Sequence, residues 1–233
     1  MARAAKESAA PAPARDRIVD ALMTLAAERR FEDISIADIA SKAGVSLADF
    51  RDCFPSKGAV LAGFSRRIDR IVLDGTSDDL AGESDRDRLF DVLMRRLDAM
   101  APYKAALAGI VDWTRRDPLS AAPLNQTMVN SMRFMLEAAA LSAEGPLGAM
   151  KLQGMALAWA RIVDTWLQDD DAGLSATMAE LDRTLARGAR LSARAEDVGR
   201  IVQPFAALAR TLVLSGQRMA GRRRATREED ADA

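Results

Sequence analysis

Side chains that could carry out nucleophilic or acid–base catalysis are scarce in this sequence. It contains no histidine and a single cysteine, Cys53. A chain without histidine cannot build the serine–histidine or cysteine–histidine pairs of many hydrolases, and it lacks the commonest ligand of protein-bound metals. No phosphate-binding loop, glycine-rich nucleotide fingerprint or pair of catalytic carboxylates stands out either. We therefore expect a protein that is not an enzyme and that uses no cofactor.

Two smaller features are the remaining chemical candidates. Asp169, Asp170 and Asp171 could together bind a hard cation, but adjacent acids after a helix are more typical of a solvated helix end, so no metal site is expected. Cys53 could act as an oxidation sensor, yet only Arg51 is nearby to favour a reactive thiolate. A small buried apolar side chain is the simpler interpretation of this cysteine.

The charges of the chain nearly cancel, with 33 Lys and Arg against 34 Asp and Glu. Residues 1–57 are also balanced, with nine residues of each sign. A nucleic acid would therefore have to be bound by a local arrangement of side chains rather than by overall charge. No segment approaches the ~20 apolar residues of a membrane-spanning helix. The lone cysteine and the lack of a secretory leader predict a cytoplasmic protein.

The apolar residues recur at spacings of three and four along nearly the whole chain, which predicts an all-α fold. A polar linker over residues 76–84 separates two helical regions. Beyond it we expect helices over residues 86–100, 102–116, 123–142, 146–168, 174–191 and 197–218. The predicted organisation is a flexible arm over residues 1–14, a three-helix domain over 15–75, a larger helical domain over 85–218 and a disordered charged tail over 219–233.

Two short helices joined by a tight turn follow the first amphipathic helix. Ser35 and Asp38 are spaced so that each side chain can bind the backbone amide of the other at a helix start. Gly44 suits the left-handed turn at the end of that helix. Ser46 and Asp49 repeat the reciprocal cap for the next helix. This pattern predicts a helix-turn-helix.

The segment from Arg17 to Phe64 carries a more specific pattern. It contains Phe31 in a turn, the run S-I-A-D-I-A-x-x-A-G-V-S, and F-P-S-K at residues 54–57. In these features it resembles the TetR family of bacterial regulators. The resemblance implies a homodimer that binds a palindromic double-stranded DNA operator, and a repressor that is released by a small apolar effector.

The resemblance also implies how the helix-turn-helix meets DNA. The helix over residues 47–53 would enter the major groove, and the start of the next helix would meet a phosphate. Arg51, Asp52 and Cys53 occupy the place where the family usually has a tyrosine and a histidine. Asp49 is either the partner of a cap or a neighbour of the DNA, and an acid such as Asp52 suits the amino group of cytosine. The predicted DNA-binding residues are Lys42, Ser46, Leu47, Ala48, Asp49, Arg51, Asp52, Ser56 and Lys57.

The C-terminal region is implied by the same resemblance to bind the effector and to dimerise. Eleven methionines suit a roomy apolar pocket, or equally a loosely specified core. For Trp159 and Trp166, which are predicted to lie in the dimer interface, plain core packing is the alternative. The predicted ligand-binding residues are Tyr103, Trp113, Met128 and Phe134. The predicted dimer-interface residues are Trp159, Ile162, Val163, Trp166, Leu181 and Leu185.

A second resemblance leaves an alternative function open. Residues 88–107 and 156–185 are similar to ubiquinone-biosynthesis lipid-binding proteins, which share the TetR fold but do not bind DNA. A C-terminal stripe of Ile201, Phe205 and Leu208, followed by several arginines, could lie at a membrane surface. The same stripe could instead pack on its own domain or on a partner subunit.

Overall fold

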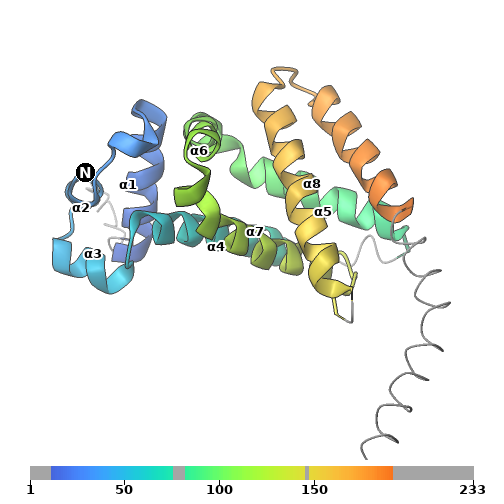
Figure 1. Cartoon of the computed structure of the whole chain (residues 1–233), viewed down its shortest axis with the longest axis horizontal. Helices are drawn as coiled ribbons and strands as arrows, with labels where there is room; N and C mark the ends of the chain where they lie inside the picture. The colour runs from blue at the N-terminus through green and yellow to red at the C-terminus, as the bar shows by residue number, and fades with distance from the viewer. Residues whose placement is uncertain (1–11, 76–81, 145–146, 191–233) are drawn as a thin grey trace, which may run out of the picture. The chain divides into compact units, whose positions relative to one another are not determined.

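The structure of the chain is a computed structural model that describes residues 12–75, 82–144 and 147–190. Every regular element in these residues is a helix, which confirms the predicted all-α fold (Figure 1). The chain divides into two compact units, residues 1–183 and 184–233. The helices are α1 (Ala14–Glu28), η1 (Phe31–Asp33), α2 (Ile36–Ala43), α3 (Leu47–Cys53), α4 (Lys57–Asp74), α5 (Asp85–Met100), η3 (Ala101–Tyr103), α6 (Lys104–Arg116), α7 (Pro118–Ala138), α8 (Gly148–Gln168) and a last helix that occupies residues 175–190 of the described chain.

Helices α2 and α3 form the predicted helix-turn-helix. At the start of α2, Asp38 N donates to Ser35 Oγ over 3.1 Å, and Ser35 N donates to Asp38 Oδ2 over 2.9 Å. The helix ends at Gly44, whose φ of +63° lies in the left-handed region that favours glycine. This turn lets Val45 N donate to Ala40 O over 3.0 Å. Local hydrogen bonds thus fix both ends of α2.

Helix α1 supports the helix-turn-helix from one side. It packs against α2, α3 and α4. The apolar side chains buried in this region include Ile18 and Leu22 of α1, Ile39 of α2, Phe50 of α3 and Val60 of α4. Burial of such side chains stabilises a domain by about 1.5–3 kcal/mol each. The amphipathic face of α1 therefore sets the position of α3.

Helix α4 joins the helix-turn-helix to the following helices. Its later turns pack against α5 and α7, while α1 packs against α6 (Figure 1). The segments 15–75 and 85–183 are therefore in extensive contact within the first compact unit. The predicted division into a domain over 15–75 and one over 85–218 stays a prediction.

Helix α7 begins earlier than its predicted range of 123–142. The side chain of Asp117 accepts a hydrogen bond from Ser120 N over 3.1 Å, and Pro118 occupies the first turn. Proline is well tolerated there because the first amides of a helix have no helical acceptor. Pro123 consequently lies inside α7 rather than at its start. The prediction was wrong because it took the second proline as the boundary.

The end of α7 yields a stability prediction. Ala140 follows the helix with a left-handed φ of +56°, which lets Leu141 N donate to Leu136 O over 2.8 Å. Because alanine is strained in this region and glycine is not, Ala140→Gly is expected to raise the free energy of unfolding by about 0.5–1 kcal/mol. Urea unfolding followed by circular dichroism would measure this change. The control is Ala122→Gly within α7, which is expected to lower stability by about 1 kcal/mol. A loss of stability in Ala140→Gly would contradict the prediction.

Several predicted segments lie outside the described residues. These are most of the arm over residues 1–14, the helix over 197–218 and the tail over 219–233. Within the described ranges, no helix is both long enough and apolar enough to cross a membrane.

Candidate nucleic-acid interface and buried polar cluster

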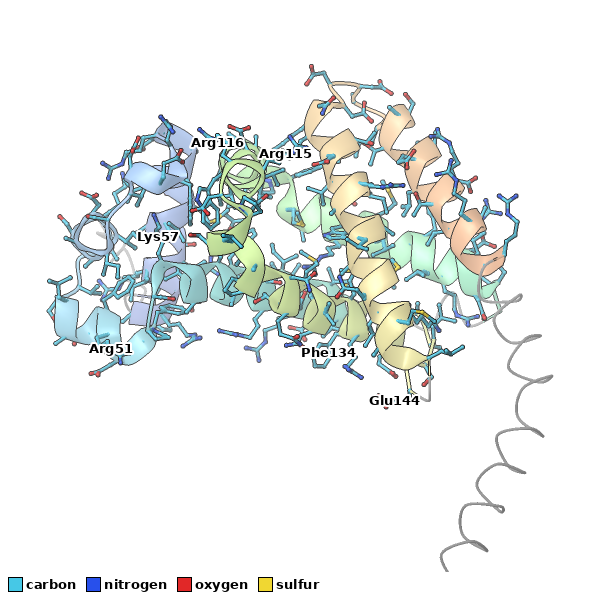
Figure 2. All side chains as sticks on the ribbon, in the orientation of Figure 1. Arg51, Lys57, Arg115, Arg116, Phe134 and Glu144 are labelled. Atoms are coloured by element: carbon cyan, nitrogen blue, oxygen red, sulfur yellow. The ribbon has the colours of Figure 1, made fainter. Side chains whose placement is uncertain are left out.

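Helix α3 has one exposed face and is held to the domain by a buried side chain on its opposite face. Leu47, Ala48, Arg51 and Asp52 are exposed, whereas Phe50 is buried. Leu47 is 59% exposed, which is high for a large apolar side chain. Figure 2 shows Arg51 on the outer side of this helix. A short, rigid helix with one buried anchor and four projecting side chains has the geometry needed to enter a DNA groove.

The acid at the start of α3 binds its own helix. Asp49 N donates to Ser46 Oγ over 3.0 Å, while Ser46 Oγ and Ser46 N donate to Asp49 Oδ2 over 2.7 Å and 3.2 Å. The side-chain and backbone hydrogen bonds from Ser46 hold the pKa of Asp49 below its ordinary value. Of the two interpretations of Asp49, the structure shows the reciprocal cap.

Lys57 is bound inside the chain. Its Nζ donates to Phe31 O over 2.7 Å and to Ile34 O over 2.8 Å, and lies 4.3 Å from the centre of the Phe31 ring. Burial lowers the pKa of Lys57, an effect that the charges of Glu32 and Asp33 oppose. Two of the three N–H groups of the ammonium are therefore used to hold η1 against the start of α4.

The other predicted backbone contacts lie at helix ends. Ser56 caps α4, because Ala59 N donates to Ser56 Oγ over 3.2 Å, and it is exposed. Lys42 is exposed on α2, with Nζ 3.8 Å from Glu28 Oε1. An exposed pair at this distance contributes little stability, so the ammonium can exchange its carboxylate for a phosphate at low cost.

Two arginines of α1 were missed by the sequence analysis. Arg15 Nη1 donates to Cys53 O over 3.0 Å, at the last residue of α3, and its guanidinium lies 4.2 Å from the Phe54 ring centre. Arg17 Nη1 donates to Ala43 O over 3.1 Å, at the end of α2. Cations suit the C-terminal ends of helices, where carbonyl groups lack helical partners. These arginines therefore lock the orientation of the helix-turn-helix.

Helix α6 touches the turn that precedes the helix-turn-helix. The Trp113 ring packs on Phe31 with 4.5 Å between centroids, and Arg116 Nη1 lies 3.1 Å from Glu32 Oε1. On its other side, Arg115 Nη2 lies 2.7 Å from Asp164 Oδ1 of α8. Figure 2 labels both arginines at the end of α6. Helix α6 thus contacts η1 and α8 through adjacent residues.

The predicted ligand-binding residues are spread over different places. Tyr103 lines a groove of about 220 Å³ beside α1, and its ring meets Phe64 edge-on at 4.9 Å. Phe134 is half exposed and lines a separate groove of about 250 Å³ between α4 and α7. Met128 is half-buried on α7, while Trp113 packs on η1. The structure does not bring these four residues into one cavity.

A buried polar cluster lies between α4, α5 and α7. Arg96 of α5 is only 2% exposed, and its Nη1 donates to Asp69 Oδ1 of α4. Ser131 Oγ of α7 donates to the same carboxylate oxygen over 2.6 Å, and Arg96 Nη2 lies 3.5 Å from Ser65 Oγ. Burial lowers the pKa of Arg96, and the nearby charge of Asp69 opposes this shift. None of these residues belongs to a sequence pattern that indicates a site.

The predicted dimer-interface residues all lie inside the subunit. Four of the six belong to α8, and the other two belong to the last helix. All six are buried in the single chain, so each packs within its own subunit. For the two tryptophans this packing is the stated alternative. These residues are Trp159, Ile162, Val163, Trp166, Leu181 and Leu185.

Two of the three consecutive acids, Asp169 and Asp171, cap the last helix. Thr177 N and Thr177 Oγ1 donate to Asp169 Oδ2 over 2.8 Å and 2.7 Å, and Ser175 N donates to Asp171 Oδ2 over 3.1 Å. Hydrogen bonds from Thr177 hold the pKa of Asp169 below its ordinary value. Among the described residues, no three or more Asp, Glu or Cys side chains lie close enough together to hold a metal ion.

Comparison with known proteins gives structural matches alone. No family model matches the sequence, and no curated protein was found to be similar. A TetR transcriptional regulator from Nitrosomonas europaea ATCC 19718 matches 75% of this chain and 97% of its own, with a TM-score of 0.59 and 23% identity. One from Rhodococcus sp. RHA1 matches 75% and 95%, with a TM-score of 0.56 and 20% identity. A TetR-family transcriptional regulator from Streptomyces coelicolor matches 82% and 86%, with a TM-score of 0.51 and 19% identity.

Proposed function

We propose that this chain, which has the fold of TetR transcriptional regulators, is a homodimeric DNA-binding repressor that a small ligand releases from its operator. The observation that carries the proposal is the exposed face of α3 on a helix-turn-helix with reciprocal caps at both of its helices. The hydrogen bonds from Arg15 and Arg17 support it, because they hold the ends of both helices rigidly.

The side chains of α3 are assigned roles by their chemistry. Arg51 can donate two hydrogen bonds to a guanine edge, and Asp52 can accept one from the amino group of cytosine. Leu47 and Ala48 suit contact with thymine methyl groups. Contacts to phosphates come from Lys42, Ser56 and the remaining N–H of Lys57. Asp49 serves the recognition helix as its cap rather than by touching a base.

The decisive experiment concerns Arg51. An operator duplex would first be selected from a random-sequence library with the full-length protein, and its binding then followed by fluorescence anisotropy at several salt concentrations. We expect Arg51→Ala to weaken binding about tenfold or more, because one bidentate base contact contributes about 1–3 kcal/mol. The matched control is Arg70→Ala on α4, an exposed arginine paired with Asp74, which should bind like the natural protein.

The selection itself can also refute the proposal. If no sequence is enriched, or if Arg51→Ala and Arg70→Ala bind equally well, α3 does not read DNA. The lipid-binding alternative would then gain support, although the C-terminal stripe that suggested it lies outside the described residues. Flotation of the protein with vesicles would test that alternative separately.

Dimerisation is proposed to use the exposed face of α8. Leu147, just before the helix, and Met150, Gly154 and Leu157 within it follow one another at spacings of three and four, and so share one side of the helix. All four are exposed, and Leu157 is 61% exposed. An apolar stripe of this kind on an otherwise packed helix is typical of a protein–protein interface. A second copy of the chain is the occupant that a palindromic operator requires.

Release by a ligand is proposed to pass through α6. This helix contacts η1 through Trp113 and Arg116, and α8 through Arg115. A ligand that displaces α6 would therefore alter the placement of the helix-turn-helix relative to the proposed dimer interface. Ligand and operator would then weaken each other's binding by the same factor.

A further inference from the structure

At the buried polar cluster, the side chains of Arg96 and of the adjacent Trp159 of α8 each carry an N–H group that lacks an acceptor among the described residues. Arg96 Nε and Trp159 Nε1 are both fully buried, and neither has a hydrogen-bond acceptor within the described part of the chain. The two residues are neighbours, because the Arg96 guanidinium carbon lies 5.5 Å from the Trp159 ring centre. A buried donor without an acceptor destabilises a protein by about 1–3 kcal/mol. Two so close together indicate a place for an acceptor that the described residues do not supply.

A groove leads toward this cluster from the surface. It has a volume of about 250 Å³ and lies between α4 and α7. Three of its lining residues, Ser65, Asp69 and Ser131, are buried and belong to the hydrogen-bond network of Arg96. The exposed ring of Phe134 forms part of its rim. The groove thus borders three of the residues that surround Arg96.

The charges of the cluster restrict which acceptor can bind. Asp69 already neutralises the guanidinium of Arg96. An anionic ligand would add a buried charge without a counter-charge, which is strongly unfavourable. An uncharged carbonyl or hydroxyl oxygen could accept a hydrogen bond without this penalty, and the rest of the ligand would meet apolar side chains such as Met135 and Trp159.

We propose that the cluster is the recognition site of the effector, and that the effector is a small, uncharged, largely apolar molecule whose carbonyl or hydroxyl oxygen accepts a hydrogen bond from Trp159 Nε1, with the neighbouring Arg96 Nε as a second donor. The groove between α4 and α7 is its entrance. The assignment as an effector site rests on the proposed regulatory function, whereas binding of the molecule can be tested without DNA.

The test uses the three tryptophans of the chain as reporters. The full-length protein is labelled with ¹⁵N-tryptophan, and its indole N–H resonances are assigned with Trp113→Phe, Trp159→Phe and Trp166→Phe. Acetophenone, which has a carbonyl acceptor, is then compared with ethylbenzene, which has a similar shape and no acceptor, and with benzoate, which is charged. We expect acetophenone to shift the Trp159 resonance downfield and to bind at least tenfold more tightly than the other two.

Calorimetric titration with acetophenone provides the matched comparison of variants. Trp159→Phe removes the donor but keeps an aromatic ring, and is expected to weaken binding about tenfold. Trp166→Phe makes the same change seven residues later on the same face of α8. This variant should bind acetophenone as the natural protein does. An unmoved Trp159 resonance, equal binding of acetophenone and ethylbenzene, or equal effects of the two variants would each overturn the proposal.

The result separates this inference from the proposed function. If the selected operator binds and acetophenone leaves Trp159 unchanged, the regulator stands and the effector site is wrong. If acetophenone binds at Trp159 and no operator can be selected, the pocket stands and the regulatory role is wrong. If both bind, acetophenone is expected to weaken operator binding in the natural protein, and about ten times as much acetophenone should be needed for the same effect in Trp159→Phe.

Discussion

Asp69→Ala is expected to lower the free energy of unfolding by about 3–5 kcal/mol, because it leaves the Arg96 guanidinium buried without a counter-charge. Arg96 is 2% exposed, and Asp69 is its only carboxylate partner among the described residues. The same change also removes the acceptor of Ser131 Oγ. Urea unfolding monitored by circular dichroism, with the midpoint and slope fitted together, would measure the loss.

A double replacement distinguishes the charge effect from lost packing. Asp69→Leu combined with Arg96→Met removes both charges and keeps apolar volume, and buried ion pairs replaced in this way are often neutral in stability. We expect the double variant to be within about 1–2 kcal/mol of the natural protein. A loss below about 1 kcal/mol in Asp69→Ala alone would mean that water reaches the guanidinium and that the cluster is not closed.

Leu157→Asp is expected to convert the proposed dimer into monomers and to weaken operator binding about 100-fold or more. The aspartate would place a charge at the C-terminal end of the apolar stripe on α8, where it would lose its water on association. A monomer can occupy only one half-site, so the gain from simultaneous binding disappears. Sedimentation velocity would report the oligomeric state, and fluorescence anisotropy with the selected duplex would report the affinity.

Leu119→Asp is the matched control for this surface. Leu119 lies on α7 and is 87% exposed. Its replacement by aspartate therefore makes the same chemical change at an exposed leucine outside the α8 stripe. It should remain dimeric and bind the operator normally. A dimeric Leu157→Asp, or dissociation by Leu119→Asp, would place the interface elsewhere.

Features that depend on neighbouring residues in the sequence were predicted correctly. The caps made by Ser35 with Asp38 and by Ser46 with Asp49, and the turn at Gly44, each involve atoms within a few residues of one another. Their stereochemistry is therefore determined locally and can be read from residue types and spacing. The all-α fold follows similarly from the periodicity of apolar residues.

Features that depend on distant residues were not predictable in the same way. Arg96 and Asp69 meet across two helices, and a charged residue in a helix is normally expected at the surface. Lys57 is directed to the carbonyl groups of η1 instead of to solvent, which no spacing rule indicates.

The α8 residues illustrate a different limit of sequence analysis. Trp159 and Trp166 are seven residues apart and so share one face of α8, but periodicity does not reveal whether such a face packs inside the subunit or against another one. In α8 the large aromatic residues face the core. The smaller and more flexible side chains, including Met150 and Leu157, are the ones left exposed.

The hydrogen bonds of Arg15 and Arg17 have a kinetic consequence. These guanidiniums hold helix ends and Lys57 holds η1, so Arg51 and Lys42 are the main cations that the helix-turn-helix can offer to a passing duplex. Affinity for bulk DNA depends mainly on such cations and is therefore expected to be small. A regulator built in this way would slide only briefly along the chromosome and would find its operator mostly by direct encounter from solution.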